Sequence, residues 1–123
     1  MQYLLLIHDD PQFWAGLTEE ERGSYFQEYM RYTNELIEAG VFVGGNQLQP
    51  TDTATVVRVR DGDTLTTDRP FAETKEQLGG YYLIEASSLD DALDWAAKIP
   101  SARFGSIEVR PVVPPRVPAE ATG

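Results

Sequence analysis

The chain has 123 residues, the length of one domain, and its 20 acidic residues against 10 basic ones give it a formal charge of −10. This charge repels phosphate backbones and the basic residues are scattered along the chain, so we expect no direct nucleic-acid partner. The absence of cysteine excludes disulfides, iron–sulfur clusters and thiolate zinc sites. The apolar run from Tyr3 to Ile7 is too short for a signal peptide or a membrane span, so we expect a cytoplasmic protein with no membrane partner.

The first half of the chain predicts a strand, a long helix and a second strand. The continuous apolar run from Tyr3 to Ile7 is typical of a strand buried on both faces. Thr18-Glu-Glu-Glu21 matches a capping box, and the apolar residues that follow recur every three or four positions. Gly40 is a typical residue just after a helix. We therefore expect a helix from Thr18 to Ala39 and a strand from Val41 to Gln49.

The second half predicts four more strands and a second helix. Thr53 to Arg60 alternates in the manner of a strand, and Asp61-Gly62 is a two-residue hairpin turn, so Thr64 to Thr67 should return as a short strand. The remaining elements are a strand from Tyr81 to Ala86, a helix that begins at Ser87 or Ser88 and stops at Pro100, and a strand from Ser106 to Val112.

This order of elements, βαββ(β)βαβ, predicts an α+β fold of the ferredoxin-like type, with an antiparallel sheet and two helices on one face. Several strands also carry apolar or aromatic residues on the other face, which indicates that something covers it. A second copy packed face to face would make a homodimer of the dimeric α+β barrel type. We take residues 1–113 as the domain and expect the proline-rich residues 114–123 to be a disordered tail.

The stretch RVRDGDTLTTDRPFAETKEQLGGYYLIEASSLDDALDWAAKIPSARFGSIEVRPV resembles the YCII-related group known for its DGPF, or DGPFAETKE, motif. The resemblance begins at YLLLI, includes AGVFVGGNQLQP and ends near Val112, so it covers almost the whole chain except the tail. It implies a ferredoxin-like dimeric α+β barrel in a family whose biochemical function is not established. It also implies a genomic association with extracytoplasmic-function sigma factors, and distant relatives are considered enzymes with a His–Asp site.

Two positions depart from the pattern of that family. The motif has glycine where this chain has Arg69. If the glycine serves a turn with positive φ, either Arg69 adopts a strained conformation or the turn differs in this chain. If the glycine serves close approach to a ligand, we expect Arg69 to narrow the pocket. Many members have tyrosine where this chain has His8, which argues against a catalytic role for His8 throughout the family.

His8 is the only histidine and is followed directly by Asp9. A histidine paired with a carboxylate can perform acid–base catalysis, which makes His8 a catalytic candidate. Adjacent residues of a strand point to opposite faces, however, so Asp9 is poorly placed to orient His8. The alternative is a strand-end residue with no catalytic role.

The stretch from Asp68 to Tyr82 carries a second set of candidates. Lys75 lies between Glu73 and Glu76, and a partly buried cluster of this kind can bind a polar substrate or move a proton. The alternative is a solvated loop with weak local ion pairs. Tyr81 can line a pocket with its hydroxyl, or serve as a core or dimer contact.

Glu108 and Arg110 are two residues apart on the last expected strand, so their side chains share a face. If Ile107 faces the helices, this pair points to the interior of the barrel, where charges must be paired or functional. The alternative is a structural ion pair, either mutual or with Arg58 or Arg60.

Two functions from different classes remain open. The first is a homodimer that binds a small molecule in the barrel interior and acts as a cofactor-independent lyase or isomerase. Its candidate ligand-binding residues are Asp68, Glu73, Lys75, Tyr81, Glu108 and Arg110, and its candidate catalytic residues are His8, Lys75 and Glu108. The second is a non-enzymatic regulatory protein whose acidic surface contacts a sigma factor. We expect no cofactor and no metal, because no residues have the spacing of metal ligands.

Overall fold

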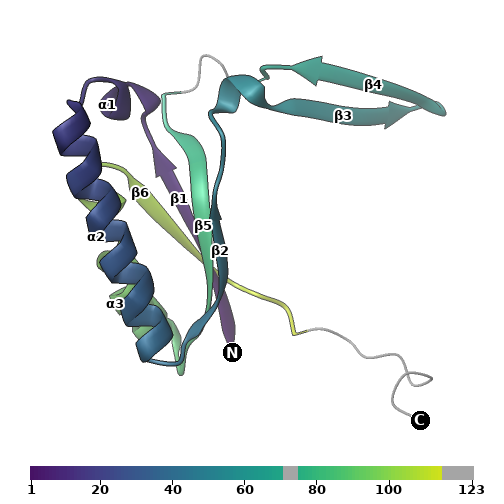
Figure 1. Ribbon diagram of the computed structural model, residues 1–123. Helices are drawn as coiled ribbons and strands as arrows, with labels where there is room; N and C mark the ends of the chain where they lie inside the picture. Colours follow the sequence, from purple (N-terminus) through teal and green to yellow (C-terminus); the bar gives the residue numbers. More distant parts are fainter. Residues whose placement is uncertain (71–74, 115–123) are drawn as a thin grey trace, which may run out of the picture.

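A computed structural model of the chain describes residues 1–70 and 75–114. Its elements are β1 (Gln2–Asp9), α1 (Pro11–Ala15), α2 (Glu19–Glu38), β2 (Phe42–Gln47), η1 (Thr51–Thr53), β3 (Thr55–Arg60), β4 (Asp63–Asp68), β5 (Gln77–Glu85), α3 (Leu89–Ala97), η2 (Pro100–Arg103) and β6 (Ser106–Pro111), where η marks a 3₁₀ turn. Strands β2-β5-β1-β6 form one antiparallel sheet in that order, and α2 and α3 cover one face of it (Figure 1). The expected α+β, ferredoxin-like fold is confirmed.

Strands β3 and β4 do not join this sheet but pair with each other, a difference from the expected run of sheet strands. We call this hairpin the arm. Its turn has positive φ at Asp61 (53°) and Gly62 (80°), as a two-residue hairpin with the twist of its strands requires. Figure 1 shows the arm extending away from the sheet on the side opposite the helices.

The base of the arm is closed by Arg69. Its backbone N–H donates to the carbonyl of Ala54 at 2.9 Å. Arg69 has a φ of 55°, so it adopts the left-handed conformation that glycine takes without strain. Of the two alternatives for the motif glycine, the turn with positive φ is therefore the one that the backbone supports.

Helix α2 begins where the sequence predicts. The Thr18 hydroxyl accepts the Glu21 N–H at 3.1 Å, and the Glu21 carboxylate accepts the Thr18 N–H at 3.0 Å. These two bonds lower the pKa of Glu21 and satisfy two helix-terminal donors. The helix ends at Glu38, and Gly40, two residues later, has a φ of 73°. Among the described residues, neither α2 nor any other helix is long and apolar enough to cross a membrane.

The core lies between the sheet and the helices. Alternate residues of β1 are buried on this side, and the residues between them are half-exposed on the face turned away from the helices, which we call the open face. The prediction that β1 is buried on both faces is therefore wrong for the single chain. The core is formed by Tyr3, Leu5, Ile7, Tyr32, Leu36, Tyr82, Ile84, Ala86, Ala92, Ala96 and Ile99.

Strand β5 begins at Gln77, four residues before the predicted start at Tyr81. The sequence does not predict the first four residues of β5, because Gly79 and Gly80 have a low propensity for strands. A Cβ on Gly80 would lie 3.0 Å from the carbonyl oxygen of Asn46 on β2. The glycines thus serve close approach of neighbouring strands, as two adjacent glycines in a strand pattern indicate.

Candidate functional site

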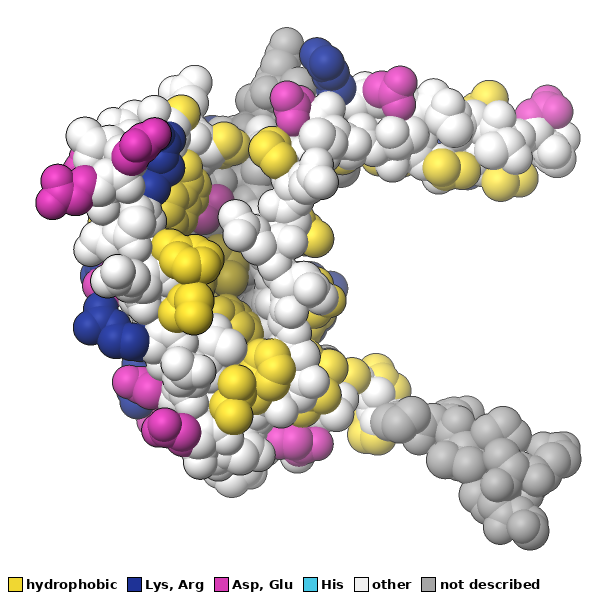
Figure 2. All heavy atoms as spheres, in the orientation of Figure 1, with side chains coloured by type: hydrophobic (Ala, Val, Ile, Leu, Met, Phe, Trp, Pro, Cys, Tyr) yellow, Lys and Arg dark blue, Asp and Glu magenta, His cyan; other side chains and the backbone are white. Residues whose placement is uncertain are grey.

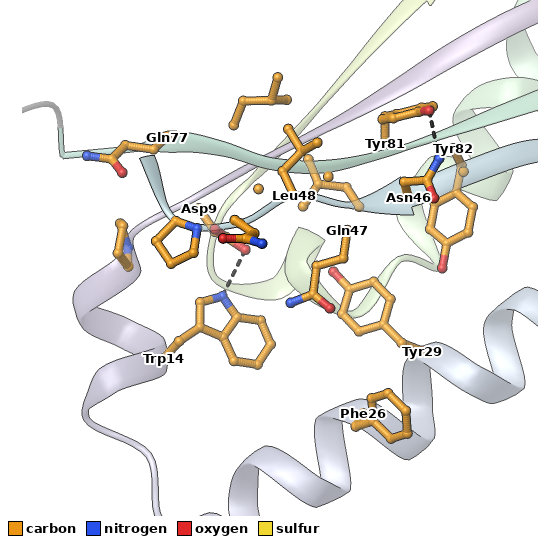
Figure 3. A pocket seen from close by; sticks show the side chains of 18 of the residues that line it. Asp9, Trp14, Phe26, Tyr29, Asn46, Gln47, Leu48, Gln77, Tyr81 and Tyr82 are labelled. Carbon is orange, nitrogen blue, oxygen red and sulfur yellow. Dashed lines mark hydrogen bonds between the residues drawn. The ribbon is translucent and has the colours of Figure 1, made fainter. Parts of the chain in front are cut away.

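A cavity of about 770 Å³ lies between α2 and the edge formed by β2 and β5. This volume is within the range of small-molecule sites. Figure 3 shows Trp14, Phe26 and Tyr29 on the helical side of the cavity, with Gln47 and Leu48 from the end of β2 opposite them. Ile7, Phe42 and Tyr82 add to the mainly apolar wall. The cavity can therefore hold a small apolar or aromatic molecule.

Asp9 lies at the inner end of this cavity, as the last residue of β1 on its helix-facing side. Its side chain is buried, with only 8% of the residue exposed. The indole N–H of Trp14 donates to Oδ2 at 2.9 Å (Figure 3). The Ser101 hydroxyl donates to the same oxygen at 3.4 Å.

Burial raises the pKa of the Asp9 carboxyl, because the charged form loses its hydration. The hydrogen bonds from Trp14 and Ser101 act in the opposite direction, and the negative charges of Glu76 and Asp10 add to the rise. A buried carboxyl with a raised pKa is a candidate for accepting and returning a proton.

A second hydroxyl extends the hydrogen-bond chain from Asp9. Ser101 is fully buried in η2, and its hydroxyl is in hydrogen-bond contact with both Asp9 and Tyr29. When Asp9 is ionised it can only accept, so Ser101 gives its one proton to Asp9 and the Tyr29 hydroxyl donates to Ser101. Burial raises the pKa of Tyr29 to about 12, which keeps its phenol protonated at neutral pH. Tyr29, Ser101 and Asp9 thus form a continuous chain of donors that ends on the carboxyl group.

Aromatic packing fixes the indole of Trp14. Phe13 stacks on Phe104 with ring centroids 3.8 Å apart, and Trp14 meets the edges of Phe104 and Tyr25 at 5.5 and 5.4 Å. These rings attach α1 to α2 and to the segment before β6. The donor that holds Asp9 is therefore positioned by a packed cluster and not by a free loop.

Two glycines adjoin Asp9. A Cβ on Gly105 would lie 2.4 Å from the carbonyl oxygen of His8 and 3.0 Å from the Asp9 Cβ, so no side chain fits there. A Cβ on Gly79 would lie 3.1 Å from Oδ1, the Asp9 oxygen that Trp14 and Ser101 do not contact. Glycine at position 79 leaves the space beside this oxygen open.

The structure brings three predicted site residues together on the open face. His8 Nε2 lies 3.2 Å from one oxygen of Glu108, and Arg110 donates to the other oxygen. Arg110, and then His8, lowers the pKa of Glu108. The mutual ion pair that the sequence left as an alternative is formed, and Arg58 and Arg60 lie apart on the arm. Asp9 points to the opposite face from His8, so these neighbours do not pair.

The other predicted residues are dispersed. Asp68 ends β4 and accepts a hydrogen bond from the Thr55 hydroxyl at 2.9 Å, and Lys75 is exposed before β5. Tyr81 borders the cavity, but its hydroxyl accepts from Asn46 at 2.9 Å on the open face. Glu73 lies outside the described residues. Within those residues, no three His, Asp or Glu side chains are placed to hold a metal ion.

Asp9 is not among the site residues predicted from the sequence, although the pattern of β1 points to it. Tyr3, Leu5 and Ile7 alternate towards the core, and the next step of two residues is Asp9. A carboxylate in phase with a buried apolar series is costly and points to a role. Ser101 gives no such signal, because a short 3₁₀ turn after Pro100 has no periodicity.

Known proteins similar to this chain identify its family. Residues 1–116 match the model of the YCII-related domain. The chain belongs to the YCII-related family. The uncharacterised protein R00369 of Rhizobium meliloti (strain 1021) is 39% identical over 114 residues, which are 91% of this chain and 92% of that protein.

A solved structure is also similar to this YCII-related chain. It is the 5-chloro-2-hydroxyhydroquinone dehydrochlorinase from Burkholderia phenoliruptrix, in complex with 2,5-dihydroxybenzoquinone. The TM-score is 0.52 at 16% identity, over 92% of this chain and 94% of the dehydrochlorinase. At this identity the likeness shows a common fold.

Proposed function

We propose that this YCII-related protein is an enzyme that moves a proton on a small, flat, mainly apolar molecule bound between α2 and the sheet. The observation that carries the proposal is the position of Asp9, a buried carboxyl with a raised pKa at the inner end of an aromatic-walled cavity. Natural cores rarely retain such a group without a use for it, since an apolar residue would be more stable there.

The proposed reaction is an isomerisation in which Asp9 is the acid–base group. The ionised carboxylate takes a proton from one atom of the bound molecule, and the carboxyl returns it to another atom of the same molecule. This proton balance needs no co-reactant. Trp14 and Ser101 stabilise the ionised state of Asp9 by their hydrogen bonds, and Tyr29 supplies the donor behind Ser101. The dehydrochlorinase with the same fold supports a ring-shaped ligand by analogy.

Thermal unfolding in the presence of 2,5-dihydroxybenzoquinone, simple phenols and aliphatic acids of similar size tests the binding. We expect ring compounds to raise the Tm with concentration and aliphatic acids to leave it unchanged. Phe26→Ala, in the cavity wall, should remove the shift. Met30→Ala is the matched control, because Met30 is exposed on the same helix but is not among the residues that line the cavity. No shift with any ring, or an equal shift in both variants, would refute the proposed site.

We also propose that the protein is a homodimer in which two open faces pack together, as the resemblance to its family implies. Leu4, Leu6 and Leu83 are half-buried on this face of the single chain, so pairing would remove further apolar surface from water. The His8–Glu108–Arg110 cluster would then lie in the barrel interior, with its charges already paired.

A further inference from the structure

The arm is a two-stranded hairpin that stands clear of the domain. Among the strands of residues 1–70 and 75–114, β3 and β4 pair only with each other, and Figure 1 shows the arm extending beyond the sheet on the open side. Val57, Val59 and Leu65 are 60%, 59% and 51% exposed. An isolated hairpin is marginally stable in water even when its register is well defined. A hairpin with this much exposed apolar surface is better explained if another surface covers it.

One face of the arm carries no charged side chain except Asp68, which lies at its base opposite Thr55. Val57 is opposite Thr66 and Val59 is opposite Thr64, so these four β-branched side chains share a face. The other face carries Arg58, Arg60, Asp63 and Leu65. The centres of protein interfaces are depleted of charge, so the valine–threonine face is the one suited to burial.

The arm forms one side of a hollow. Figure 2 shows the arm projecting beside the sheet, with a hollow between them. Hydrophobic side chains lie on the side of the arm that faces this hollow. The arm therefore presents apolar side chains to the hollow.

The dimensions of the arm fit a second copy of the chain. Each strand has six residues, so the arm extends about 20 Å at roughly 3.3 Å per residue. Two sheets that pack face to face lie about 10 Å apart. An arm of this length crosses that gap, passes the edge of the second sheet and reaches the layer of the second copy's helices.

The expected area of contact also favours a second copy of the chain as the partner of the arm. Four strands spaced about 4.8 Å apart and about 20 Å long present a face of about 400 Å². A stable interface buries about 800 Å² on each partner, so the sheet face alone supplies half of it. One face of the arm offers about 200 Å². Each chain would bury this face of its own arm and an equal area beneath the arm of the second copy, which supplies the other half.

We infer that the arm, residues 55–68, is a clasp that grips a second copy of this chain through the face formed by Val57, Val59, Thr64 and Thr66. The inference rests on the proposed homodimer and is independent of the reaction proposed for Asp9. It adds a specific contact to the pairing of open faces, and it explains why the hairpin leaves the sheet.

Sedimentation equilibrium of the full chain tests the clasp. We expect the wild type to be a dimer at micromolar concentration, and Val57→Ser/Val59→Ser to raise the dissociation constant at least tenfold. Leu65→Ser removes a similarly exposed residue from the charged face, and it should change the constant less than threefold. The arm is not part of the four-stranded sheet, so its substitutions should leave the sheet and its helices intact. Circular dichroism should therefore show both variants folded.

Hydrogen exchange of the wild type gives a second readout that needs no variant. The amides of β3 and β4 should be protected at dimeric concentrations and should exchange rapidly after dilution below the dissociation constant. If the valine variant stays as dimeric as the wild type, or if arm protection does not depend on concentration, the clasp is wrong and the homodimer stands. If the wild type is a monomer, both are wrong, and binding of ring compounds in the cavity is untouched.

Discussion

His8 and Asp9 are neighbours in the sequence, yet the strand places them in opposite environments. His8 lies on the open face beside Glu108, in a cluster whose charges are paired and partly exposed to water. Asp9 lies on the helix-facing side, buried beside a cavity and held by Trp14 and Ser101. The hydrogen bond from Arg110, and then the one from His8, lowers the pKa of Glu108, whereas burial raises the pKa of Asp9. A strand end can thus carry a structural ion pair and a candidate catalytic acid one residue apart.

The largest expected effect separates the two faces by activity. Asp9→Asn removes the acid–base group but keeps its shape, so proton transfer to a bound ring should fall about 10²- to 10⁴-fold. The measurement is incorporation of deuterium from D₂O into 2,5-dihydroxybenzoquinone, followed by NMR. The matched variant His8→Asn should stay within threefold of the wild type. Equal losses of activity in the two variants would implicate the open face in the reaction. The proposed difference in function between His8 and Asp9 would then be wrong.

The next effect concerns the group that holds Asp9. Ser101→Ala removes a buried donor and leaves the Tyr29 hydroxyl without its acceptor, which should cost about 1–3 kcal/mol in the free energy of unfolding. Because the Ser101 hydrogen bond lowers the pKa of Asp9, its loss should raise this pKa further. The limb of the pH–rate profile that reports Asp9 ionisation should therefore move to higher pH.

A purely structural role for Ser101 predicts something else, namely a less stable protein with an unchanged pH profile. Ser101→Thr retains the hydroxyl and is the control, provided that circular dichroism shows the native fold. If its profile matches the wild type while that of Ser101→Ala moves, the chain from Tyr29 to Asp9 positions the acid. A profile that moves equally in both variants would assign the effect to packing.

Much of the fold could be predicted because its signals are local. The capping box at Thr18 and Glu21 and the stop at Gly40 fix α2 within a residue, and Asp61-Gly62 fixes the turn of the arm. The direction of the arm could not be predicted, because alternation along Thr53 to Arg60 identifies a strand but not the strand it pairs with.

The candidate site was harder to predict, because its members meet only through tertiary structure. Trp14, Tyr29 and Ser101 come from α1, α2 and η2, and no spacing in the sequence links them. The pairing of Glu108 with Arg110 was accessible, since residues two apart on a strand share a face. The sigma-factor partner and the barrel-interior ligand site stay predictions.

The smallest expected effect distinguishes Asp9 from Glu108 by the pH dependence of stability alone. The raised pKa of Asp9 means that the fold favours its neutral form, so stability from this group is complete below the unfolded pKa near 3.8 and is lost as pH rises through the folded pKa. Asp9→Asn, which stays neutral, should therefore unfold at a higher Tm than the wild type at pH 7. The two should converge as pH falls towards 4.

Glu108→Gln should do the opposite. The lowered pKa of Glu108 gives stability that is present above its unfolded value and is lost as pH falls through its folded pKa. The glutamine variant should therefore be slightly less stable than the wild type at pH 7, by a small margin because the pair is exposed to water and screened by salt. Thermal unfolding of both variants from pH 4 to 8 measures the two signs together. Destabilisation by Asp9→Asn at pH 7 would mean that the hydrogen bonds to Asp9 outweigh the cost of its burial. Asp9 would then have a structural role, like Glu108 on the open face.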